Sequence, residues 1–92
     1  MKKELLFITV IGKDKKGIVA SISTFLSKNE INIEDISQKV IEGYFVMTML
    51  VDMKEAKTPL DKIRVELEKI GKKLGLEIQL HHESIFTAMH RI

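Results

Sequence analysis

The spacing of apolar and polar positions along the chain predicts four strands and two helices. Continuous or alternating apolar positions indicate strands, whereas apolar positions three and four residues apart indicate helices. The strands are expected at 5–11, 31–41, 44–51 and 76–82, and the helices at 17–29 and 59–74. The order is therefore strand, helix, strand, strand, helix, strand, which is the ferredoxin-like βαββαβ arrangement of an α+β sandwich.

Turn and capping residues mark where these elements begin and end. Asp14 is expected to cap the first helix, and Asn29 to end it in the left-handed conformation. Thr58 is expected to cap the second helix, with Pro59 as its first residue. Residues 42–43, Glu-Gly, form a two-residue hairpin turn, since glycine readily adopts positive φ.

Two features of the strand segments indicate how the sheet is assembled. In the segment 31–41 the apolar positions change parity near Glu34 and Asp35, which indicates a β-bulge. Right-handed crossovers place the first and third strands in the middle of a four-stranded antiparallel sheet, in the order four, one, three, two, with both helices on one face. The first and third strand segments are also the two that are apolar on both faces, which agrees with this order.

The face of the central strands opposite the helices is left without a covering layer. An exposed apolar patch of this kind usually marks an interface, and a core of this size is only marginally stable alone. The sequence therefore predicts a homodimer in which residues 1–92 form a single domain. Residues 84–92 are amphipathic and are expected to form a helical turn that covers an exposed apolar strip.

Composition and charge narrow the classes of function. The chain has 92 residues, no cysteine and a formal net charge of +2. Cysteine-based metal sites, disulfides and thiol nucleophiles are thereby excluded, and the charge gives no strong attraction to nucleic acid or anionic membrane. No uncharged stretch approaches the roughly 20 residues of a membrane helix, and no signal-peptide cleavage site follows the first apolar run. We expect a cytoplasmic protein.

The connection between the first strand and the first helix, residues 12–19 with the sequence GKDKKGIV, is the strongest candidate for ligand binding. Backbone N–H groups at a helix N-terminus have no acceptor within the helix, and the helix dipole favours an anion there. Gly17 allows a ligand to approach the main chain closely. The loop can therefore hold a carboxylate or a phosphate. The alternative is that Asp14 caps the helix and Gly17 only avoids a clash.

Residues 14–19 (DKKGIV), followed by Ile22, Leu26 and residues 31–36 (INIEDI), resemble the signature of the ACT domain, a small-molecule-sensing module attached to many enzymes of amino-acid metabolism. Residues 43–45 and 81–92 resemble a family of stand-alone bacterial and archaeal ACT proteins, which is similar to the repressor of the glycine cleavage system. The resemblance implies a side-by-side or face-packed homodimer. It also implies an amino acid bound where the first loop of one subunit meets the second strand of the other, and regulation of a separate protein partner.

The resemblance also implies, by position, which residues contact the amino acid. The implied ligand-binding residues are Asp14, Gly17, Ile18, Asn32 and Ile33. Gly17 and Ile18 would offer backbone N–H groups to the ligand carboxylate. Asp14 would shape the loop or meet the ammonium group, and Asn32 would hydrogen-bond the amino acid.

Two functions of other classes stay open beside the sensor. RNA-recognition domains share this element order and stack bases on aromatic residues of their first and third strands, here Phe7 and Tyr44. A purely structural dimer for protein interaction is the other alternative. An enzyme is not expected, because no nucleophile has an obvious base and no P-loop glycine spacing occurs.

Histidines near the end of the chain are the candidates for a metal site. His81 and His82 are adjacent on a predicted strand, so their side chains point to opposite faces and cannot both ligate one ion. Together with His90, they are expected to be structural residues at a dimer seam. No metal and no cofactor are therefore expected.

Overall fold

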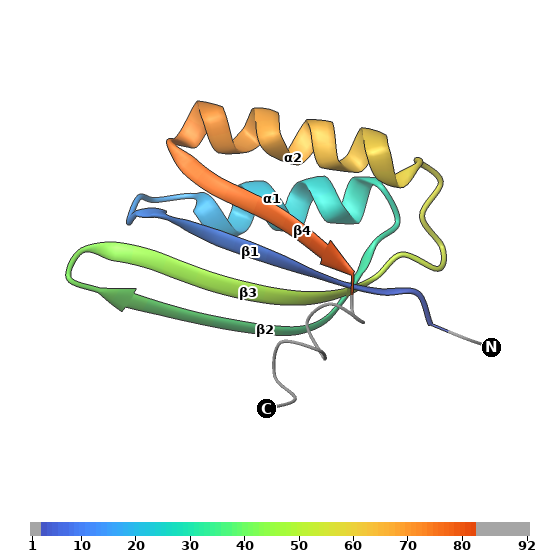
Figure 1. The fold of residues 1–92 in the computed structure, drawn as a ribbon, viewed down its shortest axis with the longest axis horizontal. Helices are drawn as coiled ribbons and strands as arrows, with labels where there is room; N and C mark the ends of the chain where they lie inside the picture. Colours follow the sequence, from blue (N-terminus) through green and yellow to red (C-terminus); the bar gives the residue numbers. More distant parts are fainter. Residues whose placement is uncertain (1–2, 83–92) are drawn as a thin grey trace.

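The computed structural model describes residues 3–82, which form a four-stranded antiparallel sheet with two helices along one face (Figure 1). The elements are β1 (Leu5–Lys13), α1 (Ile18–Lys28), β2 (Asn32–Ile41), β3 (Tyr44–Asp52), α2 (Leu60–Leu74) and β4 (Leu76–His82). The strand order is β2-β3-β1-β4. The predicted ferredoxin-like fold and its strand order are therefore confirmed.

The core lies between the helices and the central strands. Alternate residues of β1 and β3 are buried, as expected when one face of a strand packs against helices. The buried residues of the helices are Ile18, Ile22, Leu26, Ile63, Leu67 and Gly71. Among residues 3–82, no polar or charged side chain is buried. The core is thus entirely apolar, and every ionisable group of the described chain keeps contact with water.

Within residues 3–82, no helix lies over the opposite face of the sheet. Val46, Thr48 and Leu50 of β3 point to this side and are half-buried. On the same side, Ile11 is 50% exposed and Tyr44 is 51% exposed. The predicted apolar face without a helix over it is therefore present as far as the described residues go, and the homodimer inferred from it stays a prediction.

Two local features of β2 and β3 agree with the sequence patterns. The register of β2 against β3 shifts between Ile33 and Asp35, which confirms the β-bulge. The turn between the two strands has φ 51° at Glu42 and φ 82° at Gly43, the positive values that a tight two-residue hairpin turn requires.

The predicted bounds of α1 agree with the structure to within one residue, but the roles predicted for Asp14 and Asn29 are wrong. Gly17 precedes the helix, whereas Asp14 lies three residues earlier and donates its main-chain N–H to the carbonyl oxygen of Gly43 at 3.0 Å. This bond fixes the loop to the β2–β3 turn and keeps Asp14 away from the capping position. Asn29 has φ −99°, and the left-handed residue is Glu30 with φ 58°. The chain therefore reverses one residue later than predicted.

The predicted cap of α2 is also wrong. The helix begins at Leu60, after Pro59, and within the described chain no side chain caps it. Instead of capping, the Thr58 hydroxyl donates to Oδ1 of Asn29 at 2.9 Å. This contact joins the connection before β2 to the connection before α2. At the other end, Gly75 ends the helix with φ 69°, as its position after the last apolar residue predicts.

Two predictions concern the segment after β4. The helical turn at 84–92 and the histidine His90 lie outside the described residues. Within residues 3–82, neither helix combines the length and the apolar character that a crossing of the lipid bilayer needs.

Candidate functional site

The first half of the candidate site is the N-terminus of α1. Gly17 has φ 85°, a left-handed value that favours glycine, and a Cβ placed there would have no heavy atom of the described chain within 4 Å. Glycine is therefore required by the backbone conformation and not by lack of space. Among residues 3–82 no side chain caps this helix, and its first turn holds no acidic residue. The N–H groups of the first turn are open to an anion.

Three lysines give the loop before α1 its positive charge. Lys13, Lys15 and Lys16 are exposed, and Asp14 is the one acidic residue among them. Nζ of Lys15 lies 3.4 Å from the position that a Cβ on Gly75 would take, so this side chain lies over the turn between α2 and β4. The charge of the loop and the dipole of α1 therefore act in the same direction and attract anions.

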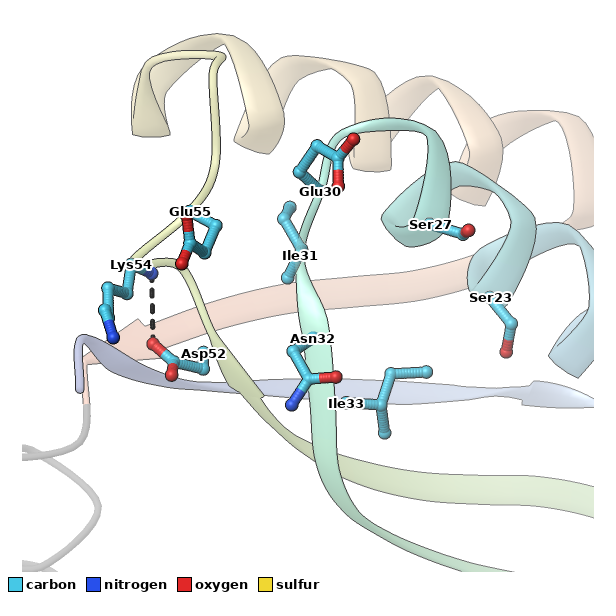
Figure 2. A pocket seen from close by; sticks show the side chains of 9 residues that line it. All are labelled: Ser23, Ser27, Glu30, Ile31, Asn32, Ile33, Asp52, Lys54 and Glu55. Carbon is cyan, nitrogen blue, oxygen red and sulfur yellow. Dashed lines mark hydrogen bonds between the residues drawn. The ribbon is translucent and has the colours of Figure 1, made fainter.

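The second half of the candidate site is an open cleft at the other end of α1 (Figure 2). Its volume of about 650 Å³ lies in the range of small-molecule sites. Its walls come from the second half of α1, the start of β2 and the end of β3 with the loop that follows. The lining residues are Ser23, Ser27, Glu30, Ile31, Asn32, Ile33, Asp52, Lys54 and Glu55.

Asn32 stands at the centre of this cleft with its amide group oriented by a neighbour. Nδ2 of Asn32 donates to Oε2 of Glu34, and the other carboxylate oxygen of Glu34 accepts from Nζ of Lys3. The hydrogen bond from Lys3, and after it that from Asn32, hold the pKa of Glu34 below its ordinary value. Because Nδ2 is engaged, Oδ1 of Asn32 is the atom that can accept a hydrogen bond from a ligand.

Asp52 places a fixed negative charge in the same cleft. Its Oδ1 accepts the main-chain N–H groups of Glu4 and Lys54, each at 3.0 Å, and Figure 2 shows the second of these bonds. The bond from Glu4, followed by that from Lys54, lowers the pKa of Asp52 below its ordinary value. The carboxylate is therefore ionised at neutral pH and can attract an ammonium group.

The structure brings two of the predicted ligand residues together and separates them from the other three. Asn32 and Ile33 both line the cleft. Asp14, Gly17 and Ile18 lie at the opposite end of α1, which at 11 residues is about 16 Å long. The side chain of Ile18 is buried, so only its main chain could meet a ligand. A single copy of the chain therefore holds two separate half-sites.

Several cleft residues have no counterpart in the sequence prediction. Ser23 and Ser27 are four residues apart on α1, so they lie on the same side of the helix, and this spacing is the signal that could have found them. Asp52 reaches the cleft because it pairs with Asn32 across the two strands. That pairing depends on the bulge in β2, and the sequence alone does not give the register.

The sheet register bears on the RNA-binding alternative. On β1, Phe7 stands opposite Leu50, whereas Tyr44 of β3 stands opposite Lys13. The six residues from Phe7 to Lys13 put the two aromatic side chains about 20 Å apart along the sheet. Stacking of successive bases needs aromatic residues on adjacent positions of the central strands. The arrangement therefore argues against recognition of RNA by this face.

The two histidines at the end of β4 point to opposite faces of the sheet as predicted, and their predicted place at a dimer seam stays a prediction. His81 pairs with Phe7 and His82 pairs with Leu6, so the two imidazoles lie on opposite faces of the sheet. Within residues 3–82, no group of three histidine or acidic side chains is arranged to hold a metal ion.

Comparison with known proteins agrees with the fold. Residues 4–81 match the family model of the ACT domain. A UPF0237 protein of Methanopyrus kandleri is 49% identical over 85 residues, which cover 92% of this chain and 94% of the relative. An ACT domain protein from Streptococcus pneumoniae has a TM-score of 0.79 at 38% identity and covers 92% of this chain and 96% of its own.

A protein assigned as a transcriptional repressor of the glycine cleavage system shares the fold. Its TM-score is 0.70 at 24% identity, over 87% of this chain and 46% of the other. At this identity the likeness concerns the fold alone.

Proposed function

Because this chain belongs to the ACT-domain family, we propose that it is a regulatory module that binds a free amino acid between two copies of itself. The family gives the coarse class, a small domain that binds a regulatory ligand. The proposal adds the class of ligand, the homodimer, and a separate protein whose activity the dimer modulates.

The observation that carries the proposal is that the half-site at one end of α1 attracts negative charge, whereas the half-site at the other end attracts positive charge. An amino acid presents a carboxylate and an ammonium group a few ångströms apart. The uncapped N-terminus of α1 at Gly17 offers N–H groups and positive charge, which suit the carboxylate. At the other end of the helix, Oδ1 of Asn32 and the carboxylate of Asp52 suit the ammonium group.

A second copy is needed because the two half-sites are too far apart to hold one small molecule. A two-fold axis beside β2 would set α1 antiparallel to α1 of the second copy. Gly17 of one copy would then face Asn32 of the other, and each dimer would contain two complete sites. The five residues that we assign to ligand binding would all be used in this arrangement.

The free edge of β2 supports this side-by-side pairing. β2 is an edge strand of 10 residues, and a long exposed edge readily pairs with another strand. On the helix side of the sheet, Ile36 is 40% exposed and Val40 is 58% exposed. These side chains would gain apolar contacts from the second copy.

Regulation would follow from the position of the ligand between two copies. An amino acid that contacts both copies stabilises the paired arrangement, and a partner protein that binds this arrangement preferentially gains affinity by the same factor.

The test is a thermal-shift screen of the common amino acids, followed by calorimetric titration of those that stabilise the protein. A ligand at 100 times its Kd adds about 2.7 kcal/mol, which is easily measured for a domain of this size. Gly17→Ala and Asn32→Ala should abolish the shift. If no amino acid raises the melting temperature of the parent protein, the structural dimer becomes the better account.

A matched control separates binding from folding. Ser37→Ala changes another exposed polar residue of β2 that lies outside the cleft. This control variant should keep the ligand-dependent shift.

A further inference from the structure

We propose that the edge of β4 that faces away from β1, together with the groove between this edge and α2, binds an extended segment of a different protein as a fifth strand of the sheet. The segment carries an acidic, a basic and an acidic residue at alternate positions. This surface, here called the edge groove, lies outside both half-sites. The inference rests on the proposed function only in taking the segment to belong to the regulated partner.

The edge groove consists of two hollows that meet beside β4. Their volumes are about 340 and about 200 Å³, and both are lined by Glu68, Ile78 and Gln79. One wall is α2, which packs along β4 (Figure 1). Of the described residues, none from β1 lines either hollow. The space therefore lies on the outer side of β4, where a further strand would be added.

The hydrogen bonds of β1 show which main-chain groups of β4 point into the edge groove. At the two ends of the β1–β3 pairing, the N–H of Met53 donates to the oxygen of Glu4 at 2.8 Å, and the N–H of Asp14 donates to the oxygen of Gly43 at 3.0 Å. Even-numbered residues of β1 thus bond to β3 and odd-numbered residues bond to β4, because successive residues of a strand direct their main-chain groups to opposite sides. The β4 residues that pair with odd-numbered residues are Glu77, Gln79 and His81.

Ile78 and Leu80 lie between these residues, so their N–H and C=O groups point away from β1. Because β4 is the last strand of the sheet, no other strand within residues 3–82 receives these four groups. Ile78 is only 8% exposed, so its main-chain groups have little contact with water. Main-chain groups that are mostly buried without a partner cost free energy, and an added strand would supply the missing partners.

Three charged side chains of α2 line the edge groove in a row. Arg64, Glu68 and Lys72 are four residues apart, so they follow one another at about 6 Å along the same side of the helix. Alternate residues of a strand are about 6.6 Å apart and also point to the same side. An added strand would therefore place three alternate side chains beside the three charges of the helix.

Charge complementarity then fixes the chemistry of the segment. It requires an acidic residue beside Arg64, a basic residue beside Glu68 and an acidic residue beside Lys72. Arg64 is available for this contact, because its ion pair with Asp61 is long, at 3.7 Å, and Asp61 is 98% exposed. Residues 1–92 contain no such alternation of acidic, basic and acidic residues. The edge groove therefore fits a segment of a different protein and not a second copy.

The hollows also give the pairing of the segment. Arg64 shares one hollow with Leu80, and Lys72 shares the other with Leu76. In an antiparallel segment, the first acidic residue would stand opposite Leu80, the basic residue opposite Ile78 and the second acidic residue opposite Leu76. The first two would exchange main-chain hydrogen bonds with the edge of β4.

The first test is a nuclear magnetic resonance titration of the isotopically labelled protein with a synthetic peptide in which glutamate, lysine and glutamate alternate with threonine. The amide signals of Ile78 and Leu80 should shift and their hydrogen exchange should slow. The same peptide with lysine, glutamate and lysine should bind about tenfold more weakly or less. Methylation of the main-chain nitrogens of the first glutamate and the lysine should abolish binding, since it keeps the charges and removes two strand bonds.

A charge exchange then tests the register. Arg64→Glu should weaken binding of the first peptide about tenfold, because it removes one ion pair and creates a repulsion. Replacing the first glutamate of the peptide by lysine should restore the affinity. Lys62→Glu is the matched control, because Lys62 is an exposed residue of α2 outside the edge groove and the net charge changes equally. It should change the affinity less than twofold.

Each outcome decides the question. A peptide that shifts no amide of β4, or that binds equally well with its charges exchanged, would overturn the proposal. Amides of Ile78 and Leu80 that are already protected from exchange in the protein alone would also overturn it, because residues 83–92 or a second copy would then hold this edge. Arg64→Glu should keep the melting-temperature shift with an amino acid, since Arg64 lies outside both half-sites, so the two proposals can fail separately.

Discussion

Replacement of Gly71 by alanine should destabilise this protein, although alanine is the better helix former. Gly71 is buried in α2, on the side that faces β4. A Cβ at this position would stand 2.7 Å from the main-chain oxygen of Leu76 and 3.3 Å from Cγ1 of Ile78. The first contact is shorter than real Cβ atoms tolerate, so either the helix or the strand must shift.

The expected loss of stability is the difference between a gain in helix propensity and the cost of overpacking. In an exposed helix, exchange of glycine for alanine gains about 1 kcal/mol. Here the obstructing atom belongs to the backbone of β4, and Leu76 is held in register with Gly12 of β1, so the strand cannot move alone. Overpacking against such a neighbour costs about 2–3 kcal/mol. The net loss of about 1–2 kcal/mol should lower the melting temperature by roughly 5–15 °C.

Circular dichroism during heating and urea unfolding measures this change. Lys72→Ala is the matched control, because Lys72 is the next residue of α2 and is exposed. It should change the stability by less than about 0.5 kcal/mol. A Gly71→Ala variant that melts at or above the temperature of the parent would show that α2 does not approach β4 as closely as described here.

Three further predictions test the core, an ion pair and a turn. Met49→Ala should lower the free energy of unfolding by about 2–5 kcal/mol in urea titrations, because the side chain is 0% exposed. The hydrogen bond from Lys3 holds the pKa of Glu34 below its ordinary value of 4.5. The ion pair therefore stabilises the folded protein above about pH 4.5, and this stabilisation is lost as the pH falls through the pKa of Glu34 in the folded state. Glu34→Gln should therefore show a flatter decline of melting temperature below about pH 4.5 than the parent, and an equally steep decline would contradict the ion pair. Gly43→Ala should cost about 1–2 kcal/mol in thermal unfolding, because its φ of 82° strains any residue with a Cβ.

The features that the sequence predicted correctly are those encoded in neighbouring residues. A strand alternates with period two, so one extra residue between Ile33 and Asp35 shifts every later side chain to the other face and is visible as a change of parity. The turn at Glu42 and Gly43 is equally local, since two residues between strands leave few backbone conformations. The strand order then follows from the handedness of the crossovers.

The capping predictions were wrong because the side chains and main chain concerned are engaged elsewhere. Capping rules treat a helix end as isolated. Thr58 donates instead to Asn29, which comes from a different connection. The loop at Asp14 is held by the main chain of Gly43, and this contact decides where α1 can begin. Contacts between distant loops cannot be inferred from the spacing of residues in one segment.

In the candidate site too, features within one segment could be predicted from the sequence, whereas contacts between distant segments could not. The loop before α1 is a continuous segment, so the sequence could identify Gly17 as a possible anion site. The cleft around Asn32 requires the register with Asp52 and the course of the loop after β3. The sequence resemblance supplied Asn32 and Ile33 but not the serines and acidic residues beside them. In the proposed dimer the two halves belong to different copies, and the spacing of residues in one chain does not encode a distance between copies.

The start of α1 leaves N–H groups of its first turn without a capping side chain, and a helix end of this kind attracts anions. Glycine at position 17 is required by its φ of 85°, no side chain of the described residues caps the helix, and Lys13, Lys15 and Lys16 raise the positive charge of the loop. The free N–H groups and the lysines both strengthen the attraction of a carboxylate, and glycine lets such a group approach the main chain closely. These features therefore support the proposed binding of the ligand's carboxylate at this end of α1.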